Sequence, residues 1–157
     1  MSDQKKYHEW ERAALFRNGR VAQTPVTGTV GRGAIERDAR LRTRPPLTAA
    51  LVARGHERFD IYCSPCHGRL GDGQGMIVAR GLPAPPTYHQ DRLRREPDQH
   101  FVDVITYGWG VMYAYNDRVA PEDRWAITAY IRALQLSQNA AFAELPGDLQ
   151  RKLPTEP

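Results

Sequence analysis

Five consecutive residues, Cys63-Ser64-Pro65-Cys66-His67, constrain this chain more than any other stretch. Two cysteines three positions apart, followed at once by a histidine, form the pattern by which haem c is attached to a polypeptide. Two thiols at this separation can each form a thioether with one vinyl group on a haem edge, and the histidine then offers an imidazole nitrogen to the iron. The sequence therefore predicts one covalent haem c, attached through Cys63 and Cys66, with His67 as an iron ligand.

A bare C-x-x-C is also compatible with a redox dithiol or with half of a zinc site. The chain has only two cysteines, and no second C-x-x-C or H-x₃₋₅-H is present to complete a tetrahedral zinc site. The glycine-rich stretch 68–76 is not a phosphate-binding loop, because no predicted strand precedes it and no Gly-Lys-Ser/Thr ends it. Haem c remains the favoured interpretation.

The second iron ligand has several candidates. Met112 lies 45 residues beyond His67, at the end of the flexible run Gly108–Met112, and this length can encircle a haem. Met76 lies only nine residues beyond His67 and would have to turn sharply around the ring edge. We therefore predict Met112, which would give an electron carrier of raised potential. An open sixth position, or a histidine ligand, stays as the alternative; those histidines are His8, His56, His89 and His100.

Four further residues are predicted to lie near the haem. Pro85, in the proline-rich run 82–86, is chosen as the carbonyl that accepts the second ring N–H of His67. Trp109 and Tyr113 are expected to pack on the haem ring, with ordinary core packing as the alternative for at least one of them. Arg80, or in its place Arg69, is predicted to neutralise a haem propionate, with a solvated arginine as the alternative.

Apolar periodicity predicts three helices. The first follows Thr48 as its N-cap, carries Val52, Gly55, Phe59 and Tyr62 on one face, and runs directly into Cys63. Gly55 inside that helix costs about 1 kcal/mol relative to alanine, so we expect it to admit another helix at close range, with Tyr130 or Trp125 over it. A short helix is predicted at 99–107 and a last one from Pro121, where proline suits the first helical position.

Charge divides the chain unevenly. Residues 1–46 hold ten basic and five acidic side chains, a balance of +5, so the other 111 residues sum to −1 of the total of +4. We predict an extended N-terminal docking arm at 1–46, a mostly α-helical haem domain at 47–138 and an irregular tail at 139–157. The arm's arginines alternate with acids and no nucleic-acid-reading motif accompanies them, so an anionic protein or lipid surface is favoured over nucleic acid.

The beginning of the chain has no apolar core of a signal peptide, and no run reaches the roughly 18 apolar residues of a membrane span. Haem c is normally attached outside the cytoplasm. We therefore expect an export signal upstream of this numbering or another route of export.

The motif around the signature, Gly55-x₃-Phe59-x₃-Cys63-x-x-Cys66-His67-Gly68, resembles class I cytochromes c. The resemblance covers about residues 47–138 and implies a helical fold around the haem, a downstream methionine ligand, and a last helix that crosses the first near its glycine. A closer resemblance, to the monohaem cytochrome c subunit of bacterial alternative complex III, rests on five runs: TPVTGTVGRG (24–33), RGHERFDIYCSPCHG (54–68), GMIVARG (75–81), DVITYGWGVM (103–112) and DRWAITAYIRALQ (123–135).

This second resemblance implies a subunit on the periplasmic face of a membrane complex that oxidises quinol. Its partners would be a multihaem cytochrome and an iron–sulfur subunit, and its electrons would pass to an oxidase or a soluble acceptor. Two departures stand out: Tyr113 replaces the proline that usually follows the ligand methionine, and the cysteine for a lipid anchor is missing. A free soluble carrier, and a haem enzyme or gas sensor with an open sixth site, remain competing hypotheses.

Overall fold

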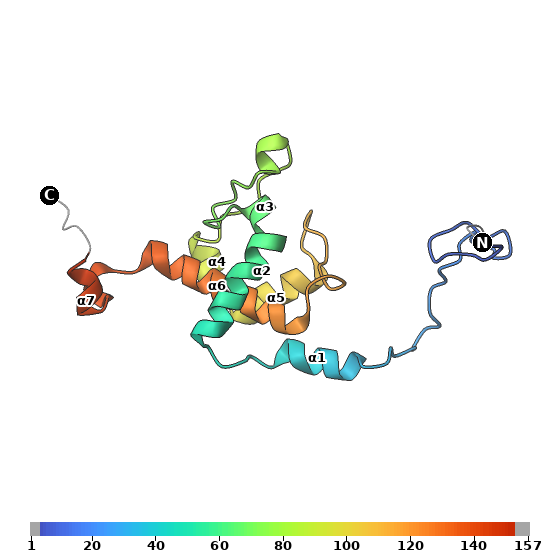
Figure 1. The fold of residues 1–157 in the computed structure, drawn as a ribbon, viewed down its shortest axis with the longest axis horizontal. Coiled ribbons are helices and arrows are strands. Elements are labelled where there is room, and N and C mark those ends of the chain that lie inside the picture. The colour runs from blue at the N-terminus through green and yellow to red at the C-terminus, as the bar shows by residue number, and fades with distance from the viewer. Residues whose placement is uncertain (1–3, 153–157) are drawn as a thin grey trace. The chain divides into compact units, whose positions relative to one another are not determined.

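Helices make up the regular structure of this protein, as the computed structural model in Figure 1 shows for the described residues 4–152. The elements, in chain order, are α1 (Ala34–Arg42), α2 (Ala49–Tyr62), α3 (Ser64–His67), η1 (Val78–Arg80), α4 (Asp91–Arg95), α5 (Asp98–Tyr107), α6 (Pro121–Asn139), η2 (Phe142–Glu144) and α7 (Gly147–Gln150). Over the described range no strand forms, and only two isolated β-bridges occur. The predicted mostly α-helical class is confirmed.

The chain divides into two units, of which the first ends at Ala34. Its described part is a set of turns: the Ala13 N–H donates to the Gly19 carbonyl (3.0 Å) and the Val21 N–H to the Glu11 carbonyl (3.3 Å). Only Ala13 is buried there. The run 24–30 contains a turn at 27–28. This unit buries almost no apolar surface of its own.

The second unit, from Ile35 onward, is built on the crossing of α2 and α6. Thr48 caps α2 as predicted, since its hydroxyl accepts a hydrogen bond from the Leu51 N–H (3.1 Å). A Cβ at Gly55 would lie 1.9 Å from the Ala126 carbonyl oxygen and 3.0 Å from the Tyr130 Cβ. The prediction that Gly55 admits another helix is therefore confirmed, with Tyr130 beside it. Trp125 lies elsewhere.

The main core lies between α2, α5 and α6. Its buried members are apolar or aromatic: Phe59, Tyr88, Leu93, Phe101, Ile105, Val119, Ile127, Ile131 and Leu134. Helix α5 begins one residue before the predicted 99, and α6 begins at Pro121 as predicted. Because α2 is anchored in this core by Phe59, the residues that follow it directly, 63–67, are presented at a fixed place.

Residues 35–46, which the sequence analysis assigned to the arm, lie against the haem domain. Leu41 is buried with Val102 and Trp125 in a second cluster. The Trp125 indole N–H donates to the Arg40 carbonyl (3.0 Å), and Arg44 pairs with Asp98 (3.2 Å). In the compact unit that starts at Ile35, the helix α1 is thus a structural part of the domain rather than extended chain.

Residues 139–152 are more regular than predicted, and the rest of the predicted irregular tail, 153–157, lies outside the described residues. Helix α6 continues to Asn139, and two single-turn helices, η2 and α7, follow it. Pro146 directly precedes α7, where proline is compatible with a helix start, and the Gln150 side chain donates to the Leu145 carbonyl (2.7 Å). No helix in residues 4–152 combines the length and apolar character that a membrane crossing needs.

Candidate haem c site

The Cys63–His67 segment is held by the chain on both sides of it. From α2, the Phe59 carbonyl accepts the Cys63 N–H (2.8 Å), and residues 64–67 form the single turn α3. The glycine-rich loop then folds back: the Gly73 N–H donates to the His67 carbonyl (2.8 Å) and the Gly75 N–H to the Cys66 carbonyl (3.1 Å). The backbone of both predicted attachment residues and of His67 is therefore fixed before any cofactor contributes.

The His67 ring lies against Tyr88, with ring centroids 4.7 Å apart and an angle of 13° between the planes. Burial lowers the pKa of His67 to about 4, so the imidazole is neutral at pH 7 and has a lone pair for a metal. Its Nδ1 atom is buried and has no hydrogen-bond partner among the described residues. A neutral histidine with an unpartnered buried nitrogen fits a metal-ligand role.

The predicted hydrogen bond between His67 and Pro85 is not formed, since neither ring nitrogen of His67 bonds to the Pro85 carbonyl in the part of the chain that the structure describes. The Pro85 carbonyl instead lies over Gly73, where a Cβ would be 2.4 Å from its oxygen. Stacking on Tyr88 sets the plane of the imidazole in place of that bond. Pro85 nevertheless lines the cavity described below.

Met112 ends a tight turn. The Trp109 N–H donates to the Met112 carbonyl (3.0 Å), and the Met112 N–H returns a bond to the Trp109 carbonyl (2.9 Å). Gly110, the first central residue, has φ +57°, the conformation that a two-residue turn of this kind needs at that position. A Cβ at Gly108 would lie 2.5 Å from the Met112 carbonyl oxygen. Glycines at both positions therefore let the chain place Met112.

Two apolar cavities, of about 400 and 170 Å³, share part of their lining, and His67 and Met112 belong to both. Cofactor pockets typically measure about 300–1,000 Å³ and are mostly apolar. The larger cavity is lined by Tyr62, Cys63, Cys66, His67, Leu82, Pro83, Pro85, Ile105, Val111, Met112, Tyr113, Tyr115, Val119 and Ile127. This cavity thus brings together two thiols, an imidazole and a thioether between apolar walls, and this donor set fits haem c.

The other predicted site residues divide into two groups. Tyr113 lines the larger cavity, and Trp109 lines the smaller one. Arg80 lines neither, because it ends η1, after which Gly81 (φ +104°) turns the chain, and its side chain is exposed. Met76 also lines neither cavity and is 58% exposed. The structure brings Arg92 to the lining of the smaller cavity instead.

The redox-dithiol and zinc alternatives find little support in the site. Burial, and next the neighbouring Cys66, raises the pKa of Cys63 to about 12, whereas reactive dithiols depend on a lowered thiol pKa. Within the described residues, no three His, Cys, Asp or Glu side chains gather so as to hold a metal ion. The buried Cys63 thiol is therefore not activated as a thiolate, which disfavours the redox-dithiol interpretation.

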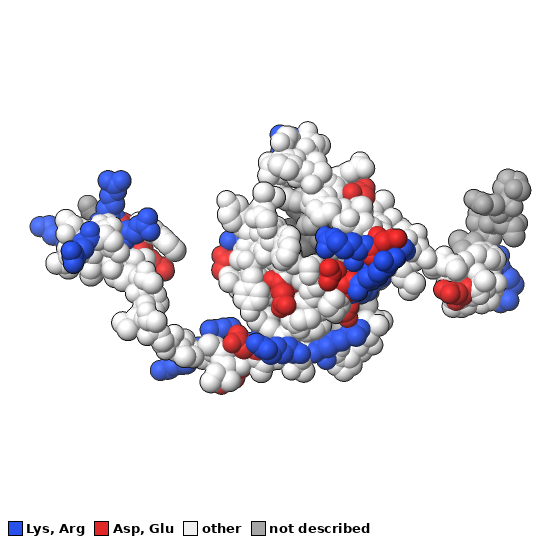
Figure 2. All heavy atoms as spheres, turned by 180° about the vertical axis from the view of Figure 1, so that it is seen from behind, with Lys and Arg blue, Asp and Glu red and all other residues white. Residues whose placement is uncertain are grey.

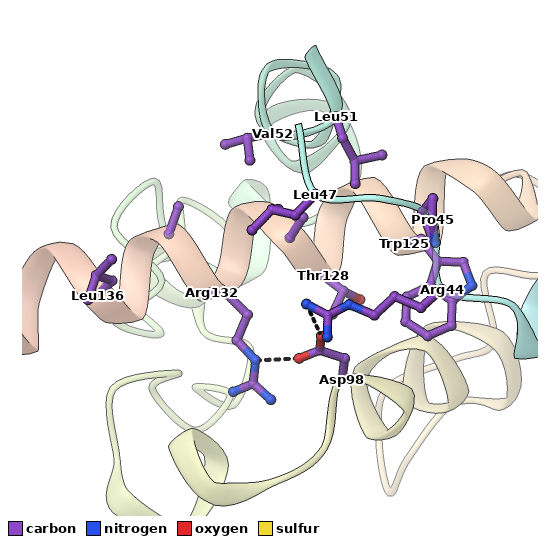
Figure 3. Close-up of a pocket in the computed structure, with 12 residues that line it drawn as sticks. Arg44, Pro45, Leu47, Leu51, Val52, Asp98, Trp125, Thr128, Arg132 and Leu136 are labelled. Carbon is purple, nitrogen blue, oxygen red and sulfur yellow. Dashed lines mark hydrogen bonds and ion pairs between the residues drawn. The ribbon is translucent and has the colours of Figure 1, made fainter. Parts of the chain in front are cut away.

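A separate hollow of about 190 Å³ lies where residues 44–52 pass α6 (Figure 3). Its charged residues pair with one another: Asp98 bonds to the Arg132 Nε (2.7 Å) and contacts Arg44 (3.2 Å). It contains no cysteine, histidine or methionine. These ion pairs link Arg44 and α6 to the start of α5.

Sequence reasoning missed two residues that organise the site. Tyr88 fixes the His67 ring, and Arg124 on α6 bonds to the loop that carries Met112. Tyr88 acts on a residue 21 positions away, and Arg124 joins acceptors 5, 8 and 18 positions away, so no helical or strand spacing marks either residue. The available signal was that Arg124, a charged residue, occurs one turn inside α6 beside the apolar run Trp125, Ala126 and Ile127.

The first and last long helices of this fold cross at a glycine. The C-x-x-C-H segment and a methionine line the same apolar cavity. Together these features define a cytochrome c domain. Residues 50–131 match the family model described as cytochrome c oxidase, cbb3-type, subunit III, which is more than half of the chain. The chain belongs to this family, and it is a haem c protein of electron transfer. A search of curated proteins found no match to it.

Proposed function

We propose that this protein is a monohaem c-type cytochrome that transfers single electrons as a subunit of a membrane quinol-oxidising complex of the alternative complex III type. The observation that supports the redox part most directly is that His67 and Met112 line the same two cavities, next to Cys63 and Cys66. When bound, the haem supplies an iron that alternates between ferrous and ferric states.

The chain's own residues have separate tasks in this proposal. Cys63 and Cys66 would hold the haem covalently, and His67 and Met112 would bind its iron. The neutral His67 needs no proton release at pH 7 before it binds, because its pKa is about 4. Apolar walls such as Ile105, Val119 and Ile127 exclude water, which keeps the environment of the iron similar in both oxidation states.

The ligand assignment is tested by Met112→Ala, with Met76→Ala as the matched control. Wild-type protein should show the far-red absorption band that methionine–iron bonding gives in the ferric state, and a mass larger than the bare chain by one haem that survives acid–acetone. Met112→Ala should abolish the band and let carbon monoxide bind readily to the ferrous form, whereas Met76→Ala should change neither. Loss of the band in Met76→Ala alone would reverse the assignment.

Membership in a complex is supported by the first unit of the chain. Several of its large apolar side chains are exposed, and the most exposed of them is Trp10, at 87%. Residues 4–34 hold six basic and two acidic side chains, and Figure 2 shows Lys and Arg dominating this unit, whereas both signs alternate on the haem domain. A segment that leaves a tryptophan in water and has almost no core is suited to bind a partner.

We propose that this arm docks on partner subunits, a multihaem cytochrome and an iron–sulfur protein, on the periplasmic face of a bacterial inner membrane. The electrons would pass on to an oxidase or a soluble acceptor. Copurification from native membranes of chains that lack residues 1–34 or residues 1–46 tests this. Both deletions should lose the partners, but only the longer one should also lower the stability of the haem domain, because it removes Leu41 from its cluster.

The competing hypotheses are separated by the same experiments. A free soluble carrier would be isolated without partners whether or not the arm is present. A haem enzyme or gas sensor with an open sixth site would bind carbon monoxide or cyanide readily at neutral pH in its wild-type form and lack the far-red band.

A further inference from the structure

Arg124 is a buried cation at the start of α6, with 3% of its surface exposed. Its Nε donates to the Val119 carbonyl (2.9 Å), one Nη to the Thr106 hydroxyl (2.9 Å), and the other Nη to the Asn116 carbonyl (3.1 Å). None of these acceptors is a carboxylate. Burying a guanidinium without an ionic partner costs free energy unless its N–H groups donate hydrogen bonds. The three bonds offset this cost, and they tie Arg124 to three fixed acceptors.

The three acceptors lie at the two ends of one loop. Thr106 is next to last in α5, just before the loop, while Asn116 and Val119 are near its end, just before α6. The loop 108–120 between these ends carries Met112. Inside it, the Tyr115 N–H donates to the Ile105 carbonyl (2.9 Å) and the Val119 N–H to the Tyr115 carbonyl (2.9 Å). Arg124 therefore closes the loop as a brace across its base.

We propose that Arg124 is a positioning residue that keeps Met112 on the haem iron, an inference that rests on the proposed role of Met112 as a ligand. The guanidinium presents its donors in a rigid planar fork, so it can hold both loop ends at once with little loss of side-chain freedom. Loops that open locally do so when few bonds hold them. With the brace in place, the two ends of the loop are held together, which limits how far the Met112 turn can move from the cavity.

The same helix provides a matched control. Arg132, eight residues further along α6, donates to the Asp98 carboxylate (2.7 Å) and to the carbonyls of Arg94 (3.3 Å) and Glu96 (Figure 3 shows the bond to Asp98). It thus braces the segment between α4 and α5, which carries no proposed iron ligand. A variant of Arg132 removes a comparable set of bonds from the same helix without touching the Met112 loop.

The test uses the full-length holoprotein in four forms: wild type, Arg124→Met, Arg124→Lys and Arg132→Met. Four quantities are measured: the melting temperature and three loop signals, which are the far-red band of the ferric form, carbon monoxide binding to the ferrous form, and amide hydrogen exchange at Met112, Tyr115 and Val119. Losing the brace should shift the equilibrium between bound and released Met112 by about tenfold. Arg124→Met should therefore weaken the band, admit carbon monoxide and speed exchange in the loop, with Arg124→Lys intermediate.

Arg132→Met should lower the melting temperature but leave all three loop signals unchanged. Equal loss of the band in Arg124→Met and Arg132→Met would overturn the inference, since a general loss of stability would then explain both. If Arg124→Met yields no folded holoprotein, Arg124→Lys decides alone, and an unchanged band in it overturns the proposal. A wild-type protein without the band would overturn the ligand assignment itself, and this inference with it.

Discussion

The two segments that carry the proposed iron ligands are held by different means. His67 is tied to the core: the loop after it bonds back to its carbonyl, and its ring lies on Tyr88, which is buried among Phe59 and Phe101. Met112 lies in a loop whose neighbours Val111 and Tyr113 are 84% and 87% exposed. Its position depends on one turn, on backbone bonds of Tyr115 and on the Arg124 brace. Changes near His67 should therefore act on the fold, and changes near Met112 on the ligand.

The largest expected effect comes from adding a Cβ atom to the closely packed backbone beside Cys66, in the segment that carries His67. In Gly75→Ala the new Cβ would lie 2.2 Å from the Pro65 carbonyl oxygen and 2.5 Å from the Cys66 carbonyl carbon, all backbone atoms. We expect this overpacking to lower the free energy of unfolding by about 3 kcal/mol, measured by denaturant titration, with less holoprotein recovered.

Gly147→Ala in α7 is the control for that substitution. Its nearest contact would be the end of the Arg151 side chain, at 3.6 Å, so it should leave the unfolding free energy nearly unchanged. Equal stability of Gly75→Ala and the control would mean that the chain around Cys66 is not as closely packed as the structure has it.

The same contrast explains which parts of this molecule the sequence predicts. The cap at Thr48, the crossing at Gly55 and the start at Pro121 depend on spacing within one helix or on one residue's geometry, and all three are found. Tyr88 acts on a residue 21 positions away, and Arg124 joins acceptors 5, 8 and 18 positions away on both sides of a loop, so only the packed structure reveals them. The packing of residues 35–46 is missed for a similar reason, because the contact of Leu41 with Val102 and Trp125 links three distant segments.

The residues of the proposed site also divide into those that local spacing predicts and those that only the packed structure places. The cysteine–histidine signature is local, and its residues do meet at the cavity together with Met112. Arg80 was predicted from charge alone, and charge does not specify direction; the turn at Gly81 leaves it exposed. The Pro85 bond was predicted from the run of prolines, which supplies carbonyls but does not determine which group each carbonyl faces.

A moderate effect is expected on the Met112 side. Gly110 has φ +57°, and no atom lies within 4 Å of a Cβ built there, so Gly110→Ala meets backbone strain without a clash. Holding alanine in this region costs about 1 kcal/mol, and part of that strain should be relieved by opening the turn. The far-red band should weaken in Gly110→Ala more than the melting temperature falls.

Asparagine tolerates the left-handed region better than alanine does. Gly110→Asn should therefore recover most of the band that Gly110→Ala loses. If both variants kept a wild-type band, the geometry of the turn would not determine whether Met112 binds the iron. The proposed sensitivity of the Met112 segment to local changes would then be wrong.

The smallest effect should come from the exposed arginines. Arg92 lines the smaller cavity, but its side chain is 58% exposed and pairs with Glu96 (3.4 Å), so solvent and its partner screen its charge. A nearby cation favours the reduced iron, which carries less positive charge, so Arg92→Gln should lower the reduction potential by an amount equivalent to about 0.5 kcal/mol. Arg80→Gln should leave the potential unchanged, because Arg80 lines neither cavity. The two reduction potentials are measured by potentiometric titration of the holoproteins. A larger shift in Arg80→Gln than in Arg92→Gln would mean that Arg80 does lie near the haem, and that the chain around η1 is closer to the cavity than the structure shows.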